Sequence, residues 1–187
     1  MALCGRCVRV PPHFNSAIAA VDYAHPWDRL ISDFKYRDGL DLGEALCALL
    51  IAAQQRFADE APDWLLPVPL GAQRLRERGY NQSWELARRC ARQLGCRTGA
   101  SMLLRIRDTP HQLSLPRERR LANVRGAFAL EPTRRTEVVG LRIALIDDVM
   151  TTQATANELS RVLLDAGAQS VQVWVVARTP PPPKTTS

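Results

Sequence analysis

Short continuous runs of apolar residues recur along this chain, separated by polar or helical segments. Runs of strand length lie at 16–23, 64–70, 142–149 and 171–177, and a shorter one lies at 126–130. Continuous runs of this kind are typical of strands that are buried on both faces of a parallel sheet. The pattern therefore predicts a sheet that is mainly parallel and covered by helices.

Apolar residues at helical spacing fill the segments between these runs. This spacing predicts helices at about 26–38, 40–59, 83–94 and 154–166. Asn81 or Ser83 is expected to cap the third helix, and Gly95 to end it. We therefore expect an α/β domain with a mainly parallel sheet, helices on both faces and a small hood built from N-terminal elements.

The two ends of the chain differ in character from this domain, which we place at residues 13–178. Cys4 and Cys7 lie in the segment 1–12 and form a Cys-x-x-Cys pair, which is half of the ligand set of a structural zinc site. Residues 179–187 contain four consecutive prolines, which cannot continue a sheet, and we expect a disordered tail there.

One stretch carries two carboxylates where a buried strand ends. Asp147 and Asp148 close the apolar run, and a hydroxyl-rich turn follows them. Ligands of parallel sheets bind at the carboxyl ends of the strands, and a turn that enters a helix offers backbone N–H groups to a phosphate. The turn consists of Thr151, Thr152, Gln153, Ala154 and Thr155. An acid pair beside a phosphate site suits a phosphorylated sugar.

The same stretch has a purely structural interpretation. Asp147 and Asp148 can be a polar strand end, and Thr155 with Glu158 has the spacing of a capping box. The two interpretations are compatible, because a capped helix is what presents the N–H groups.

Two further segments are rich in arginine. Arg74, Arg76 and Arg78 alternate along a segment that we predict to be a loop just after the strand 64–70, where they can neutralise an anion such as pyrophosphate. A long polar segment then follows and is expected to be a flexible loop, although a solvated loop without a catalytic task is the alternative. Its candidate site residues are Arg105, Thr109, Gln112, Arg120 and Asn123.

The stretch 142–155 resembles the signature of type I phosphoribosyltransferases, which bind phosphoribosyl diphosphate (PRPP). The resemblance implies that Asp147 and Asp148 bind the ribose 2′- and 3′-hydroxyls and that 151–155 holds the 5′-phosphate. Gln153 stands where that family has glycine. Since glycine permits positive φ and close approach of the backbone, a glutamine there is expected to strain or shrink the phosphate site.

Further motifs resemble those of the competence protein F (ComF) family, in the order of that family. They are Phe34-Lys35-Tyr36, Pro67-Val68-Pro69-Leu70, Arg78-Gly79-Tyr80-Asn81-Gln82, Thr109-x-x-Gln112-x-x-Leu115 and Arg120-x-x-Asn123-x-x-Gly126-Ala127-Phe128. The family begins with a four-cysteine zinc ribbon, and Cys4 with Cys7 matches only its second pair. This implies a truncated or misassigned start and an incomplete zinc site.

Composition adds a basic bias. The net charge is +6, and only Lys35 and Lys184 among 25 basic residues are lysines. Arginine binds phosphate in a bidentate, planar way, which suits phosphorylated ligands or nucleic acid, whereas a GC-rich genome is an equally simple explanation. No run is long enough to span a bilayer and no secretory signal is visible, so we expect a cytoplasmic protein with five reduced cysteines.

Together these features predict a protein that binds PRPP and Mg²⁺ and transfers phosphoribosyl to an acceptor, with loss of pyrophosphate. The alternative is a non-catalytic PRPP-binding accessory of DNA uptake, which meets single-stranded DNA or the competence machinery. Aromatic residues make up only 6% of the chain, and they supply little of the base-stacking surface that a single-strand groove normally has. The sequence indicates neither the acceptor nor the oligomeric state.

Overall fold

The computed structural model describes residues 5–36, 39–57, 60–107 and 124–180. The elements, in chain order, are α1 (Gly5–Arg9), β1 (Ser16–Asp22), α2 (Trp27–Phe34), α3 (Leu42–Phe57), β2 (Trp64–Pro67), α4 (Ala72–Arg78), α5 (Gln82–Leu94), β3 (Arg97–Thr98), β4 (Leu103–Arg105), β5 (Phe128–Leu130), the 3₁₀ helix η3 (Pro132–Val138), β6 (Arg142–Met150), α7 (Ala154–Asp165) and β7 (Ser170–Arg178).

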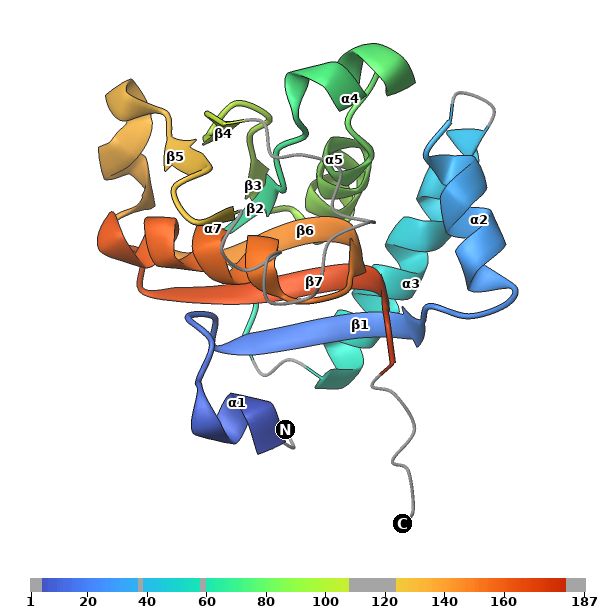
Figure 1. Ribbon diagram of the computed structural model, residues 1–187, viewed down its shortest axis with the longest axis horizontal. Helices are drawn as coiled ribbons and strands as arrows, with labels where there is room; N and C mark the ends of the chain where they lie inside the picture. Colours follow the sequence, from blue (N-terminus) through green and yellow to red (C-terminus); the bar gives the residue numbers. More distant parts are fainter. Residues whose placement is uncertain (1–4, 37–38, 58–59, 108–123, 181–187) are drawn as a thin grey trace.

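Five strands form the main sheet, in the order β1-β7-β6-β2-β3, and every neighbouring pair is parallel. β6 lies at the centre, and its residues 143–146 are fully buried because both faces are covered. All carboxyl ends therefore meet at one edge (Figure 1). The connection to α2 leaves that edge after β1, α4 follows β2, and the turn 151–153 follows β6.

Alternate residues of β6 point into two separate apolar cores. Ile143 and Leu145 pack on the side of α7, together with the small antiparallel pair β4–β5. Ala144 and Ile146 pack on the opposite side, among residues of α2, α3 and α5. The predicted mainly parallel sheet with helices on both faces is confirmed. Cys47 and Cys90 are buried in the second core, where they act as small apolar side chains.

Some local predictions are confirmed and others are wrong. The Asn81 side chain caps α5 by accepting a hydrogen bond from the Ser83 N–H at 2.9 Å, and Gly95 ends the helix with a φ of 67°. The predicted loop after β2 is instead the helix α4, which Gly79 ends in the left-handed region with a φ of 78°. Arg105 lies on β4 rather than in a loop.

In the described part of the chain, no helix combines the length and the apolar character needed to cross a bilayer.

Candidate functional site

The two acids at the end of β6 face different surroundings, because successive side chains of a strand point to opposite sides. Asp147 lines a cavity of about 50 Å³, together with the turn 151–155 and the start of α7. Asp148 is not part of that lining and is only 6% exposed. A single ordered water needs about 10–15 Å³, so the cavity accommodates a group larger than one water molecule.

Asp147 is held by hydrogen bonds that its carboxylate accepts. The Ser83 hydroxyl, at the start of α5, donates to Oδ1 at 2.9 Å, and the Asp148 N–H donates to the same oxygen at 2.9 Å. Burial, and after it the negative charge of Asp148, raises the pKa of Asp147 to about 7. This carboxyl can therefore change protonation near neutral pH.

Asp148 has its own partners on the other side of the strand. Its Oδ1 accepts a hydrogen bond from the Val149 N–H at 2.7 Å, and its Oδ2 lies 3.1 Å from the Lys35 ammonium group. Lys35 caps the C-terminal end of α2. Lys35 was not among the predicted site residues, although the motif Phe34-Lys35-Tyr36 was a signal that could have found it.

Tyr80 fixes the backbone around Lys35. Its hydroxyl contacts the Phe34 carbonyl oxygen and the Tyr36 carbonyl oxygen, the second at 2.8 Å. The Phe34 ring is fully buried and meets the Tyr80 ring edge-on at 6.4 Å between centroids. Two motifs that are distant in sequence, 34–36 and 78–82, thus form one structural unit beside Asp148.

The turn after β6 leads directly into α7, so the first N–H groups of a 12-residue helix border the cavity. Gln153 occupies the N-cap position with a φ of 65° and a ψ of 0°, and among the described residues it alone combines a positive φ with a side chain. A left-handed conformation at a non-glycine residue costs about 1–2 kcal/mol. The strain that the sequence predicted is therefore present.

Glu158 does not form the expected capping box with Thr155. Gln153, not Thr155, is the N-cap of α7. The Glu158 carboxylate instead accepts a hydrogen bond from the Gly126 N–H at 2.8 Å and pairs with Arg161 at 2.8 Å. Glu158 thereby ties the segment before β5 to α7, and the Arg161 hydrogen bond lowers the pKa of this carboxyl.

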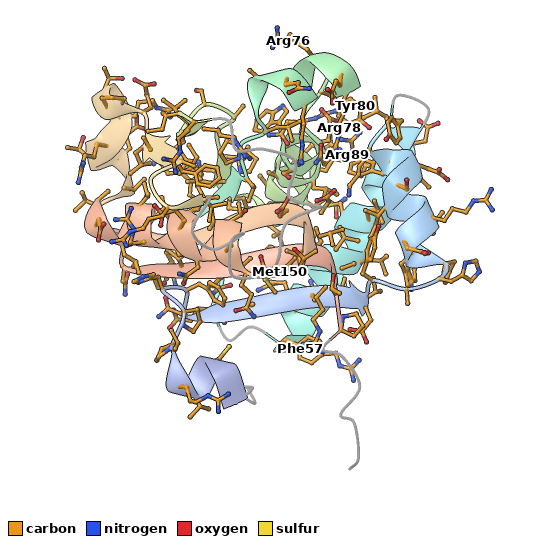
Figure 2. The ribbon with its side chains drawn as sticks, viewed as in Figure 1. Phe57, Arg76, Arg78, Tyr80, Arg89 and Met150 are labelled. Carbon is orange, nitrogen blue, oxygen red and sulfur yellow. The ribbon has the colours of Figure 1, made fainter. Side chains whose placement is uncertain are left out.

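The arginines of α4 do not form one cluster. Because residues two apart on a helix point in different directions, Arg74 and Arg78 share a face and Arg76 does not. Figure 2 shows Arg76 at the outer tip of α4, whereas Arg78 lies on the side of Tyr80 and Arg89.

These three arginines also differ from many others in having no acidic partner. No ion pair joins Arg74, Arg76 or Arg78 to an acid in the described ranges, and Glu77 instead accepts from Gln73 at 2.8 Å. Eight arginines elsewhere do form ion pairs, namely Arg88, Arg89, Arg92, Arg97, Arg134, Arg142, Arg161 and Arg178. The charge of the α4 arginines thus remains available to an anion.

The other predicted site residues lie elsewhere. The Arg105 guanidinium lies 5.5 Å from the centre of the Phe128 ring on β5, while Thr109, Gln112, Arg120 and Asn123 are outside the described residues.

Cys4 is also outside the described residues, and the Cys7 sulfur lies 4.0 Å from the Gln153 side-chain oxygen. The described residues contain no group of three or more His, Cys, Asp or Glu side chains arranged to hold a metal ion.

Comparison with known proteins identifies relatives of this chain, although no family model matches it. DNA utilization protein YhgH of Salmonella typhimurium is 35% identical over 180 residues, which cover 94% of this chain and 78% of the relative. Competence protein F of Haemophilus influenzae is 32% identical over 179 residues, with the same coverage. The chain belongs to the competence protein F family. This confirms the resemblance that the ordered motifs indicated.

A solved structure described as the allosteric regulatory enzyme of purine biosynthesis has a similar fold. Its TM-score is 0.50 at 21% identity, and the match covers 78% of this chain and 30% of that one. At this identity the similarity concerns the fold alone. The ComF-family chain accordingly has an α/β fold similar to that of this enzyme.

Proposed function

We propose that this ComF-family protein binds PRPP with Mg²⁺ at the carboxyl edge of its sheet and transfers the phosphoribosyl group to an acceptor. The observation that carries the proposal is the shared cavity of Asp147, the turn 151–155 and the start of α7. A phosphorylated ribose needs two binding groups. A carboxylate accepts hydrogen bonds from its hydroxyl groups, and a helix N-terminus favours its phosphate. In this arrangement the 5′-phosphate lies at Thr151–Thr155, and the ribose hydroxyls point to Asp147 and Asp148.

The reaction breaks the bond between ribose C1 and a pyrophosphate oxygen, and the electron pair leaves with the pyrophosphate. A nucleophilic atom of the acceptor forms the new bond to C1 and loses its proton. Positive charge develops at C1 during this step, and nearby carboxylates are placed to stabilise it electrostatically. Arg74 and Arg78, which have no acidic partner in the described part, would neutralise the departing pyrophosphate.

The donor set fits Mg²⁺ as the metal of the complex. Mg²⁺ takes oxygen ligands and binds through one or two carboxylates together with substrate phosphates. Asp147 and Asp148 are the carboxylates at the end of β6, and the metal would supply positive charge to the pyrophosphate. A zinc site at Cys7 has no such support, because no further ligands gather around it among the described residues.

Calorimetric titration of PRPP with Mg²⁺ tests binding. We expect heat from the wild type and a loss of about tenfold or more in affinity in Asp147→Asn, because a carboxylate that accepts from the ribose is removed. Asp165→Asn is the matched control, because Asp165 is exposed at the far end of α7 and pairs with Arg161. No heat from the wild type, or equal heats from wild type and Asp147→Asn, would refute the sugar-phosphate proposal.

Pyrophosphate release with a panel of nucleobases and amines tests turnover separately. Release that depends on an added acceptor, and that Asp147→Asn abolishes, is the result expected of a transferase. PRPP binding without release across the panel would favour a PRPP-binding accessory over an enzyme.

A second function is suggested by the names of the relatives. DNA utilization protein YhgH and competence protein F are named for the handling of DNA. In this chain Arg76 and Tyr36 are both exposed, and they supply a cation and an aromatic ring of the kind that single strands bind. We propose contact with single-stranded DNA as the alternative role.

Fluorescence anisotropy with a labelled oligothymidine tests this role. Affinity is expected to fall steeply with salt, because phosphate contacts release counterions, and Arg76→Ala is expected to reduce the salt slope by about 1. Arg92→Ala serves as the control, since Arg92 is also exposed but already pairs with Glu44 at 2.9 Å. A binding constant that does not change with salt would rule out a phosphate-tracking surface.

A further inference from the structure

The contact between Lys35 and Asp148 has a consequence for ligand binding. Both carboxylate oxygens of Asp148 already have a partner. Oδ1 accepts a hydrogen bond from the Val149 N–H, and Oδ2 lies 3.1 Å from the Lys35 ammonium group. Within the described ranges, Lys35 forms the one ion pair with either acid of the site. A ribose hydroxyl that donates to Oδ2 must therefore compete with Lys35.

The surroundings hold the backbone of Lys35 firmly but leave its side chain able to move. Tyr80 contacts the carbonyl oxygens on both sides of Lys35, and the neighbouring Phe34 ring is fully buried. The Lys35 side chain itself is 23% exposed. Since lysine carries a point charge on a flexible four-carbon stem, its ammonium group can change partner without movement of the backbone.

The second partner follows from the shape of PRPP. Its 5′-phosphate and its pyrophosphate leave the ribose in different directions. With the 5′-phosphate at the start of α7, a pyrophosphate on the other side of the ribose would extend across the acids toward the side of α2 and α4. Lys35 lies on that side, because it contacts Asp148 rather than the cavity lining.

We propose that Lys35 is a transferable cation, which neutralises Asp148 in the free protein and moves to the pyrophosphate of PRPP when the ribose hydroxyls take its place on Asp148. The inference rests on the proposed function and assigns Lys35 a role in it. Without ligand, the ammonium group limits the repulsion between two adjacent carboxylates. With ligand, the same charge opposes the negative charge of the pyrophosphate, so one lysine serves both states.

Two ligands distinguish this role from a structural one. PRPP carries the pyrophosphate and ribose 5-phosphate does not. In Lys35→Met, PRPP affinity should fall about tenfold, because a charge-assisted contact is lost. Ribose 5-phosphate affinity should instead rise about two- to fivefold, because its hydroxyls no longer compete with the ammonium group for Asp148. Calorimetry at fixed Mg²⁺ and pH measures both constants.

Two further variants complete the experiment. Lys35→Arg retains the charge and should keep PRPP affinity within about threefold of the wild type. Arg29→Met, on the exposed side of α2, removes a cation that has no ion pair in the described part and should change neither affinity. If Lys35→Met does not fold, as judged by circular dichroism, Lys35→Gln replaces it with the same expected results.

The possible failures can be told apart. Loss of both affinities in parallel, or no change in either, would show that Lys35 is structural or irrelevant, and the inference would be wrong while the proposed function survives. Absence of PRPP binding by the wild type would overturn both. Opposite changes for the two ligands are the result expected only of a transferable cation.

Discussion

The two neighbouring carboxylates at the end of β6 lie on opposite sides of the strand and have different surroundings. On the side of α7, Asp147 faces a cavity, accepts hydrogen bonds from Ser83 and from the Asp148 N–H, and has a pKa raised to about 7. On the side of α2, Asp148 is more deeply buried, yet it is paired with Lys35. In the described part of the chain, Lys35 thus gives Asp148 a countercharge that Asp147 lacks.

Because their surroundings differ, Asp147 and Asp148 are expected to play different roles in the site. A carboxyl that changes protonation near pH 7 can ionise when a hydroxyl donor or a metal arrives. Asp148 instead already has a cationic partner, the Lys35 ammonium group. One strand end thus presents an acid that faces a cavity beside an acid that is paired with a lysine, and the effects expected from this contrast follow from the largest to the smallest.

Asp147→Asn should stabilise the free protein at pH 8. The folded-state pKa is raised from 3.8 to about 7, so the folded state binds more protons than the unfolded state between these values. The stability that this group contributes is complete below about pH 4 and is lost as the pH rises through 7. The shift corresponds to at most about 4 kcal/mol at pH 8, and the asparagine variant avoids this loss.

Urea unfolding of wild type and Asp147→Asn at pH 4, 6 and 8 measures this effect. The difference in unfolding free energy should be near zero at pH 4 and should grow toward pH 8. A difference that is constant with pH would mean that Asp147 ionises normally.

Asp148→Asn should act in the opposite direction. It leaves the Lys35 ammonium group without its carboxylate and removes a charged acceptor for the Val149 N–H. Because Lys35 is partly exposed, water compensates for some of the loss, and we expect a destabilisation of about 2 kcal/mol at pH 7. Chemical denaturation measures it.

The exposed pair between Asp22 and Arg178 is the matched control for Asp148. Its side chains are 59% and 57% exposed, and Asp22→Asn should change stability by less than about 0.5 kcal/mol. Equal effects of Asp22→Asn and Asp148→Asn would contradict the special position of Asp148.

Tyr80→Phe should make the backbone of residues 34–36, which carries Lys35, less stable. The change removes one partly buried hydroxyl that contacts two carbonyl oxygens, at an expected cost of about 1 kcal/mol. Hydrogen exchange should accelerate at the amides of residues 35 and 36 and remain unchanged in β7. Tyr23→Phe is the control, since no side-chain hydrogen bond is found for Tyr23 in the described part. Unchanged exchange at both amides would show that Tyr80 does not position Lys35.

How far the sequence could predict these features depends on how local their causes are. Buried strands such as β6 and β7 follow from continuous apolar runs, and the caps of α5 follow from Asn81 and Gly95 alone. The helix α4 differs from the predicted loop because the prediction rested on alternating arginines just after a buried strand. Gly79, which ends α4 in the left-handed region, was a usable signal that a helix precedes it.

The candidate site was predictable only in part for the same reason. Asp147, Asp148 and the turn 151–155 are contiguous, so a motif finds them. The contacts of Ser83 with Asp147 and of Lys35 with Asp148 join segments that are distant in sequence. Nothing in a helical or strand pattern encodes such a contact, and only the folded sheet brings these side chains to one edge.

The smallest expected effect concerns the turn on the cavity side. Gln153 takes a φ of 65°, which glycine adopts without strain, so Gln153→Gly removes about 1–2 kcal/mol of strain. Glycine also adds about 0.5–1 kcal/mol of conformational entropy cost, which leaves a net stabilisation of about 0.5 kcal/mol. Gln153→Ala keeps the strain and removes the side-chain amide, so it separates the two effects.

Titration of these variants with PRPP shows whether the glutamine side chain at position 153 interferes with phosphate binding. The backbone already has the conformation that glycine favours, so Gln153→Gly should leave PRPP affinity within about twofold of the wild type. If affinity rises tenfold in Gln153→Gly and equally in Gln153→Ala, the side chain obstructs the phosphate. A rise in Gln153→Gly alone would mean that the backbone is strained away from the binding conformation, and the contrast between the two sides of β6 would then include the turn as well as the acids.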